Sequence, residues 1–317
     1  MAATKQGASQ GVALFHIYPI TAREREHANG MSHNVVEKIR EHYDVASPYY
    51  TKLWGTHLHH GYYETNLETK EEAAENLVRL LAGRAGIVRG ARILDVGCGV
   101  GGSALWLAEN LDCAVTGISI SPVQIEMAVA AAENLPRNRP VFLVDDANRM
   151  SVRGSFDAVW AIESLSHLSD RAAFFRKATE LLAPGGKICE AAWLKDERLT
   201  ARDEEKYIRP IEEGMLVSLP DLAEYKRHMD DNRLRLLYYE DISRSVARTW
   251  DLCLAMMKDK TLWQLAVRHG REFVTFLKSF KAMRDGFSTG HFRYALMVSE
   301  KNLSPGTKKR KGEKVKG

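Results

Sequence analysis

The stretch "ARILDVGCGVGGSA", residues 91–104, decides the fold of this chain. An apolar run is followed by Gly97-x-Gly99-x-x-Gly102 and then by apolar residues at helical spacing. This order predicts a strand, a tight turn and a helix. We expect Gly97 and Gly99 to let the backbone bend and approach a ligand closely, because neither carries a Cβ atom that would clash.

The residues around these glycines indicate which ligand the turn binds. A phosphate-binding Walker loop requires a lysine after its last glycine, whereas Gly102 is followed by Ser103. A dinucleotide would bring its diphosphate to the turn, where the carboxylate of Asp95 would repel it. Asp95 is better placed beside a cation. The turn therefore favours S-adenosylmethionine, which carries an α-ammonium and a sulfonium.

Composition and charge narrow the class of protein. The chain has 317 residues, 45% of them hydrophobic, which is enough for one large domain with a cap. Its four cysteines form no CxxC pair, no signal peptide opens the chain, and no apolar run reaches the roughly 20 residues of a transmembrane helix. We therefore expect a reduced, cytoplasmic protein with no stable membrane insertion.

The net charge of +4 is concentrated at the C-terminus. Residues 301–317 carry seven Lys and Arg against Glu313, so this segment has a charge of +6 and residues 1–300 have a charge of −2. A slightly acidic body argues against a nucleic-acid partner and favours a small-molecule substrate. The sequence leaves open a homodimer.

Alternating strand and helix signals predict the organisation of the chain. From residue 91 onward they favour an α/β fold, a doubly wound sheet with seven strands. The alternation in "HFRYALMVSEK" predicts a final edge strand. The predicted parts are a mobile leader (1–30), N-terminal lid helices (31–90), a cofactor-binding Rossmann-like core (91–194), a helical cap insertion (195–231), the remaining core strands with long cap helices (232–301) and a disordered basic tail (302–317).

Ligands bind at the carboxyl ends of the strands in such a sheet, and this rule selects the cofactor residues. Asp146, next to Ala147 after the third strand, is expected to accept a hydrogen bond from the adenine amine. The second strand ends at Ser119 rather than at an acid, so Gln124 is expected to reach the ribose. Ser119 is alternatively a turn or helix-capping hydroxyl. The predicted cofactor residues are Asp95, Gly97, Gly99, Ser119, Gln124, Asp146 and Ala147.

Two polar residues after the fourth strand are the candidate catalytic residues. Methyl transfer from a sulfonium releases a neutral leaving group, so only the acceptor needs chemical help. We predict His167 as the general base for an acceptor that starts protonated, because histidine titrates near neutral pH. Glu163 would orient His167 or bind an ammonium. A structural role stays open for both residues.

The segment "LWGTHLHHGYYE", residues 53–64, gathers histidines and aromatic residues before the core. No Cys, Asp or Glu stands nearby at metal-ligand spacing, so we predict no metal. Packing within a lid and contact with the cofactor's methionine end or with the substrate both remain open. Aromatic and apolar residues of the cap predict an apolar pocket, although any one of them could belong to the core. The predicted substrate and lid residues are Tyr43, His59, His60, Tyr62, Trp193 and Met215.

The motifs together carry a family resemblance over roughly residues 40–300. "ILDVGCGVGGSA", "VTGISISPVQ", "VDDA", "WAIESLSHLSD" and "LLAPGGK" resemble class I S-adenosylmethionine-dependent methyltransferases. With "HYDVASPYYTKLWGTHLHHGYYE", the chain resembles their small-molecule branch of tocopherol C-methyltransferases, sterol C-methyltransferases and rebeccamycin-type sugar methyltransferases. The pattern Ser119-x-Ser121-Pro122-x-Gln124 is similar to what this branch uses in place of a strand-two acid.

The resemblance implies a Rossmann-like mixed sheet with an antiparallel last strand, and methylation of a small lipophilic or aromatic metabolite at carbon, nitrogen or oxygen. S-adenosylhomocysteine would be the product. A cyclase or pericyclase on the same scaffold, or a protein or RNA methyltransferase, is the alternative. Several relatives carry an acid on strand five where this chain has Ala192, so Glu190, on the same face, is a candidate replacement.

Overall fold

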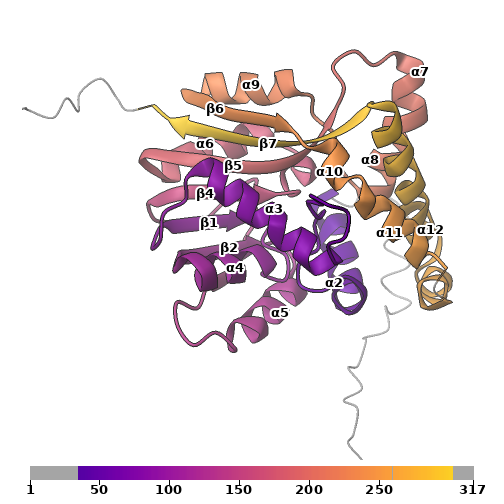
Figure 1. Cartoon of the computed structure of the whole chain (residues 1–317), viewed down its shortest axis with the longest axis horizontal. Helices are drawn as coiled ribbons and strands as arrows, with labels where there is room; N and C mark the ends of the chain where they lie inside the picture. The colour runs from indigo at the N-terminus through magenta and orange to yellow at the C-terminus, as the bar shows by residue number, and fades with distance from the viewer. Residues whose placement is uncertain (1–34, 259, 303–317) are drawn as a thin grey trace, which may run out of the picture. The chain divides into compact units, whose positions relative to one another are not determined.

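The computed structural model describes residues 35–258 and 260–302 (Figure 1). The predicted leader, residues 1–30, lies outside this part of the chain, as does the predicted tail except for residue 302.

Seven strands form one sheet in the order β3-β2-β1-β4-β5-β7-β6. β1 to β5 pair in parallel, whereas β7 is antiparallel to β5 and β6. This arrangement confirms the predicted doubly wound mixed sheet, and strand order reverses between β1 and β4. The strands are β1 (Arg92–Val96), β2 (Ala114–Ser119), β3 (Val141–Val144), β4 (Phe156–Ile162), β5 (Leu182–Lys195), β6 (Leu234–Asp241) and β7 (Phe292–Lys301).

One strand position differs from the prediction. β7 was predicted as an edge strand, yet it lies between β5 and β6, and β6 forms the edge. The burial patterns give the reason. Exposed and shielded residues alternate along β6, whereas β7 is buried almost continuously from Tyr294 to Val298. The apolar run within "HFRYALMVSEK" is therefore typical of a strand covered on both faces rather than of an edge.

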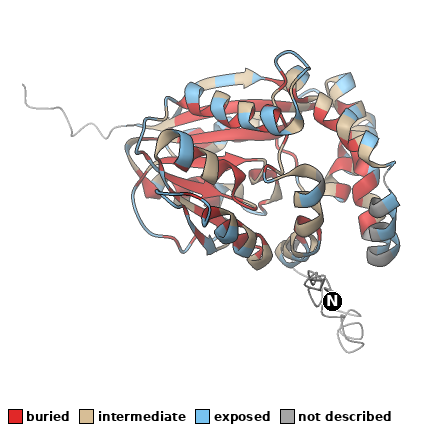
Figure 2. Cartoon of the chain, turned by 60° about the horizontal axis from the view of Figure 1, so that its bottom comes forward, coloured by how far each residue is buried: buried red, intermediate tan, exposed pale blue. Residues whose placement is uncertain are grey.

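Different helices cover the two faces of the sheet. Adjacent β4 residues Val159 and Trp160 are both fully buried and belong to separate hydrophobic clusters, because side chains alternate along a strand. In Figure 2 the strands are largely buried between helices whose outer sides are exposed. Helices α3 (Lys70–Ala85), α4 (Gly102–Leu111) and α5 (Pro122–Ala132) pack in the cluster of Trp160, and α6 (Arg171–Leu181) and α9 (Leu222–Asp231) in that of Val159.

A third group of helices stands beside the carboxyl ends of the parallel strands. Helices α11 and α12 run next to each other there, and α8 packs on α12 (Figure 1). A kink at Gly270, where φ is +75°, interrupts α12. This group comprises α2 (Val35–Trp54), α7 (Ala201–Asp203), the π-helical turn η2 (Glu204–Ile208), α8 (Arg209–Met215), α10 (Ser243–Val246), α11 (Arg248–Met256) and α12 (Lys260–Thr289).

The helical segment predicted as a cap, residues 195–231, divides into two parts. Its first helices, α7 to α8, join α12. Its last helix, α9, packs on α6 and β6 instead, where Tyr225 and Met229 are buried against the sheet. The predicted lid segment divides in a similar way. Its helix α3 covers the sheet, whereas α2 and the loop that follows it reach the carboxyl ends of the strands.

Candidate active site

A cavity of about 260 Å³ lies at the carboxyl ends of β1, β2 and β4, at the point where strand order reverses. Its inner wall contains the glycine-rich turn and the loops after β3 and β4. Its outer wall is supplied by α2, the loop at residues 56–60, α11 and α12. The position is the one that doubly wound sheets use for ligands.

In the glycine-rich turn the protein atoms leave no room for a Cβ atom at Gly97, whereas they do leave room at Gly99. Gly97 has a φ of +75°, and a Cβ atom there would lie 2.4 Å from the Cβ atom of Ser164. Gly99 requires glycine for its φ of +55° rather than for lack of space. Asp95 lies behind this lining at 2% exposure, and burial raises the pKa of its carboxyl to about 7. Its Oδ2 atom has no hydrogen-bond partner within the described residues, which suits a cationic ligand.

Ser119 and Gln124 both line the cavity and are bonded to each other. The Ser119 hydroxyl donates to Gln124 Oε1 at 2.7 Å, and Gln124 Nε2 donates to the Ser47 hydroxyl at 3.1 Å. The Ser121 hydroxyl donates to Asp44 at 2.5 Å and also caps α5. These contacts attach α2 to the N-terminus of α5 over the cavity.

The loop after β3 is held by its own acids. Asp146 accepts hydrogen bonds from the backbone and side-chain nitrogens of Asn148, at 2.9 and 2.8 Å. Asp145 accepts from the backbone of Ser151 and of Val152. Asp146 and Ala147 line the cavity as predicted, and Asn148 does so as well.

Glu163 is the centre of a buried hydrogen-bond cluster. Its Oε1 atom accepts from the backbone N–H of His60 at 2.7 Å, from His60 Nδ1 at 2.9 Å and from the Tyr294 hydroxyl at 2.7 Å. Burial alone would raise the pKa of Glu163, but the charge and hydrogen bonds of His60 outweigh it, and the pKa is lowered. The residue also has a φ of +55°, a strained conformation of the kind found at functional sites.

His57 and His59 form a second pair in the same loop. His59 Nδ1 donates to the backbone carbonyl of His60 at 2.8 Å, so its Nε2 atom is left to accept from His57 Nδ1 at 3.1 Å. Burial, the neighbouring His59 and Lys70 lower the pKa of His57 to about 3. The pKa of His59 is also lowered, chiefly by burial.

His167 connects two elements of the outer wall. Its Nδ1 atom donates to the backbone carbonyl of Leu216 at 3.1 Å, and its Nε2 atom accepts from the Tyr43 hydroxyl at 2.9 Å. Both ring nitrogens are therefore engaged. Burial lowers the pKa of His167 to about 4, so the imidazole is neutral near pH 7.

The cavity brings together most of the residues predicted for the site. Two predicted residues, Asp95 and Tyr62, are not part of the lining. Tyr62 packs against the hydrophobic cluster of Trp160, and its backbone N–H donates to the carbonyl of Ala73. The predicted residues in the lining are Gly97, Gly99, Ser119, Gln124, Asp146, Ala147, Glu163, His167, Tyr43, His59, His60, Trp193 and Met215. The lining also contains His57, from the predicted histidine-rich segment, and Trp250, one of the aromatic residues that predicted an apolar pocket. Residues in the lining that the sequence did not single out include His42, Asn148, Phe276 and Phe280.

Glu190 does not replace the missing strand-five acid in the cavity. Glu190 and Ala192 share a face of β5, as predicted, but Ala192 belongs to the cluster under α6 and α9. Trp193, on the other face, lines the cavity. Glu190 is fully buried, and burial raises its pKa to about 8.

Within residues 35–258 and 260–302, no group of three or more His, Cys, Asp or Glu side chains is arranged to hold a metal ion. The helices of the same part of the chain include none that is long and apolar enough to span a membrane.

The seven-stranded fold, the cavity beside its glycine-rich turn and the relatives of the chain together identify an S-adenosylmethionine-dependent methyltransferase. Residues 31–292 match the model of the mycolic acid cyclopropane synthetase family, and the chain belongs to this family. It is 34% identical over 269 residues to the 27-O-demethylrifamycin SV methyltransferase of Amycolatopsis mediterranei, covering 83% of this chain and 97% of that protein. It is 27% identical to the chloroplastic tocopherol O-methyltransferase of Arabidopsis thaliana, covering 84% and 82% respectively.

Solved structures show the same fold. The mycolic acid cyclopropane synthase CmaA1, complexed with SAH and CTAB, superposes with a TM-score of 0.76 at 19% identity, over 86% of this chain and 99% of that one. The [4+2]-cyclase SpnF gives a TM-score of 0.74 at 24% identity, over 85% and 97%. The predicted cofactor, S-adenosylmethionine, and the predicted methyltransferase activity are confirmed.

Proposed function

We propose that this methyltransferase transfers its methyl group to a hydroxyl oxygen of an uncharged, lipophilic metabolite. The observation that carries the proposal is the charge of the cavity. Among its described lining residues there is no Lys or Arg, whereas Glu163 and Asp146 belong to the lining and Asp95 lies behind it. An anionic acceptor would therefore meet carboxylates and no countercharge.

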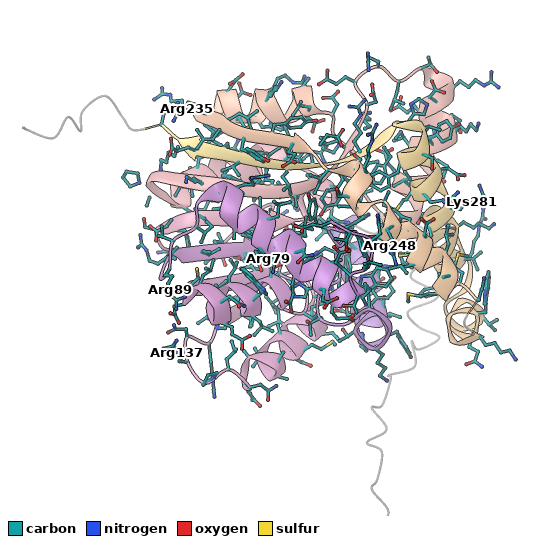
Figure 3. All side chains as sticks on the ribbon, viewed as in Figure 1. Arg79, Arg89, Arg137, Arg235, Arg248 and Lys281 are labelled. Carbon is teal, nitrogen blue, oxygen red and sulfur yellow. The ribbon has the colours of Figure 1, made fainter. Side chains whose placement is uncertain are left out.

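Three histidines of the lining do not supply that countercharge. Burial lowers the pKa of His42 and of His167 to about 4 and that of His57 to about 3, so these rings are neutral at pH 7. The labelled basic residues in Figure 3 lie on the outside of the fold, as Arg79 on α3 and Lys281 on α12 illustrate. Lys70 stands close by, 4.4 Å from the centroid of the Trp54 ring, but is not part of the lining.

A large part of the outer wall is apolar and aromatic, which suits a lipophilic body on the acceptor. Met215 from α8, Trp250 from α11 and Phe276 and Phe280 from α12 contribute to this wall. The names of several relatives support oxygen as the methylated atom. They include the rifamycin and tocopherol enzymes and the O-methyltransferase cnsE of Penicillium expansum, which is 34% identical over 200 residues.

The residues at the inner wall fit the cofactor. We propose that Gly97 and Gly99 admit its methionine portion, that Asp95 compensates its positive charge, and that Ser119 and Gln124 face the ribose and Asp146 and Ala147 the adenine. When bound, the cofactor supplies a methyl group whose carbon forms a bond to the acceptor oxygen, while the C–S electron pair stays on sulfur and leaves a neutral thioether. The protein's contribution is to hold the acceptor in line and to exclude water.

The cover over the cavity also supports action on small molecules rather than on nucleic acids or proteins, since α2 and α12 both contribute to its outer wall. Action in the cytoplasm is part of the same proposal.

Matched acceptors test the proposal. The full chain would be incubated with methyl-tritiated S-adenosylmethionine and either a long-chain alkyl hydroquinone or its monophosphate ester. We expect O-methylation of the neutral compound to be at least roughly tenfold faster. The free-energy cost of burying one uncompensated charge exceeds about 1.4 kcal/mol, which corresponds to a factor of ten. Equal or preferred methylation of the phosphate would overturn the uncharged acceptor, and methylation only at carbon or nitrogen across a wider panel would overturn the hydroxyl acceptor.

A further inference from the structure

His60 has one ring nitrogen committed and one without a partner. Its Nδ1 atom bonds to Glu163, and its Nε2 atom is buried with no hydrogen-bond partner in the described chain. His60 itself is 2% exposed and belongs to the lining of the cavity. Buried ring nitrogens without a partner are costly, so this atom points to a group that a substrate brings.

Aromatic rings enclose His60. The ring centroids of Trp250 and Tyr294 are both 5.0 Å from its own, and those of Trp193 and Phe287 are both 5.9 Å away. The indole nitrogens of Trp193 and Trp250 are also buried without hydrogen-bond partners among the residues described. An acceptor nitrogen and two N–H donors therefore belong to one aromatic cage beside the cavity.

Glu163 determines which nitrogen of His60 carries the proton. A carboxylate only accepts hydrogen bonds, so Nδ1 must be the N–H group, and whenever the ring is in its neutral form the lone pair is on Nε2. The same carboxylate stabilises the imidazolium that forms when Nε2 gains a proton. An ionised carboxylate that orients a histidine base in this way is the arrangement of known catalytic sites. We call His60 and Glu163 the dyad.

We propose that His60, oriented by Glu163, is the general base that deprotonates the acceptor hydroxyl, and that Trp193 and Trp250 donate hydrogen bonds to its oxygen. This inference rests on the proposed O-methyltransferase function. The O–H bond breaks, its electron pair stays on oxygen, and the proton forms a bond to Nε2. His60 then releases that proton to solvent, so each methyl transfer liberates one proton.

The other histidines of the cavity are less suited to this step. His167 and His59 each use both ring nitrogens, and the pKa of His57 is lowered to about 3. The hydrogen bonds of His167 to Tyr43 and to Leu216 instead connect α2 to the end of α8, so His167 positions these two helices. The titratable groups that face the dyad are His57 and His59 from its own loop, Tyr43 from α2, Tyr294 from β7, Cys253 from α11 and His167 after β4, with Lys70 near His57.

A binding experiment tests the base without methyl transfer. 4-Nitrophenol would be bound to the full chain saturated with S-adenosylhomocysteine, and its ionisation followed by absorbance against pH. We expect the bound phenol to ionise at a lower pH than in solution in the wild type, and His60→Gln to abolish this shift. The control His228→Gln on α9 should keep it. Loss of the shift in His167→Gln but not in His60→Gln would overturn the proposal.

Nitrogen NMR gives a second readout that a merely structural role would not produce. In the wild type, the ¹⁵N shifts of His60 should identify protonated Nδ1 and unprotonated Nε2, and Glu163→Gln should change this tautomer ratio. A wild-type ring protonated at Nε2 near pH 7 would overturn the proposal.

Turnover separates this inference from the function on which it rests. On a phenol series of decreasing pKa, the defect of His60→Gln should shrink from a value of order 10² to 10⁴ as the phenol becomes more acidic. Trp250→Phe should lower kcat more than it raises KM. A wild type that methylates no hydroxyl defeats the proposed function, whereas a wild type that does so with an equal defect for every phenol defeats the base alone.

Discussion

Asp44 on α2 accepts a 2.5 Å hydrogen bond from the hydroxyl of Ser121, the residue that caps α5 beside the cofactor turn. The neighbouring contact from Gln124 to Ser47 has the same direction, from α5 to α2. Since α2 supplies part of the cavity's outer wall, the two contacts join the cofactor side of the site to its cover. Ligand binding and the order of α2 are therefore expected to be coupled.

Asp44→Ala should loosen α2. A hydrogen bond to a charged, partly buried group contributes about 1.5 to 3 kcal/mol, so local opening of residues 35–54 should become at least roughly tenfold more frequent. Hydrogen exchange of the chain bound to S-adenosylhomocysteine would measure this. Glu41→Ala, at an exposed position of the same helix, is the control. Identical exchange in Asp44→Ala and the wild type would show that the contact does not hold α2.

Asp95 should make cofactor binding depend on pH. Burial raises its pKa to about 7, and a cationic ligand beside it would favour the ionised form. Binding near pH 6.5 should thus release protons, and affinity should increase from pH 6 to pH 8. Calorimetry in buffers of different ionisation enthalpy measures the released protons. Asp95→Asn should bind the cofactor more weakly and release fewer protons on binding. Proton release equal to that of the wild type would show that another group causes the pH dependence.

The positions of the proposed cofactor residues were largely predictable from the sequence because their signals are local. Gly97 needs a positive φ and close approach within one turn, and Asp146 and Ala147 follow directly from the end of a recognisable strand. Such residues are placed by a few neighbours along the chain. The same reasoning predicted Glu163, which follows β4.

On the acceptor side the sequence predicted individual lining residues but not their pairing, because the contacts join distant residues. His60 and Glu163 are 103 positions apart, and their pairing depends on where the loop after α2 lies in the folded chain. Glu190 shows a related limit. Alternation along β5 gave the correct relation between Glu190 and Ala192, but only packing against α6 and α9 decides which face they occupy.

Acid should destabilise the protein through its buried neutral histidines. The pKa of His57 is about 3 in the folded chain against a reference of 6.5, so between these values the unfolded chain binds the extra proton. Stability is therefore lost as pH falls through this window. From pH 6.5 to 4.5 this histidine should contribute about 2 kcal/mol to that loss. Urea unfolding of His57→Gln should show a shallower decline than the wild type or His228→Gln, and an equally steep decline would refute the assignment.

Glu190 should make the folded protein less stable as pH rises, whereas His57 makes it less stable as pH falls. Its carboxyl oxygens, the Tyr225 hydroxyl and the Ser299 hydroxyl are buried without hydrogen-bond partners among the described residues, and burial raises the pKa of Glu190 to about 8. Ser299 lies diagonally across from Glu190, since β7 pairs it with Ile188. Between the model-peptide value of about 4.5 and pH 8, the folded chain binds the proton that the unfolded chain has lost. Stability must then decrease as pH rises through this window.

Glu190→Gln removes that ionisation while keeping the shape of the side chain. Its free energy of unfolding, relative to that of the wild type, should rise with pH by up to about 1.4 kcal/mol per unit and level off above pH 8. Urea titrations at pH 5, 6, 7 and 8 would measure the difference. Glu180→Gln, at an exposed position on α6, should run parallel to the wild type. Parallel curves for Glu190→Gln would mean that this carboxyl is already ionised in the folded chain, with a partner that lowers its pKa.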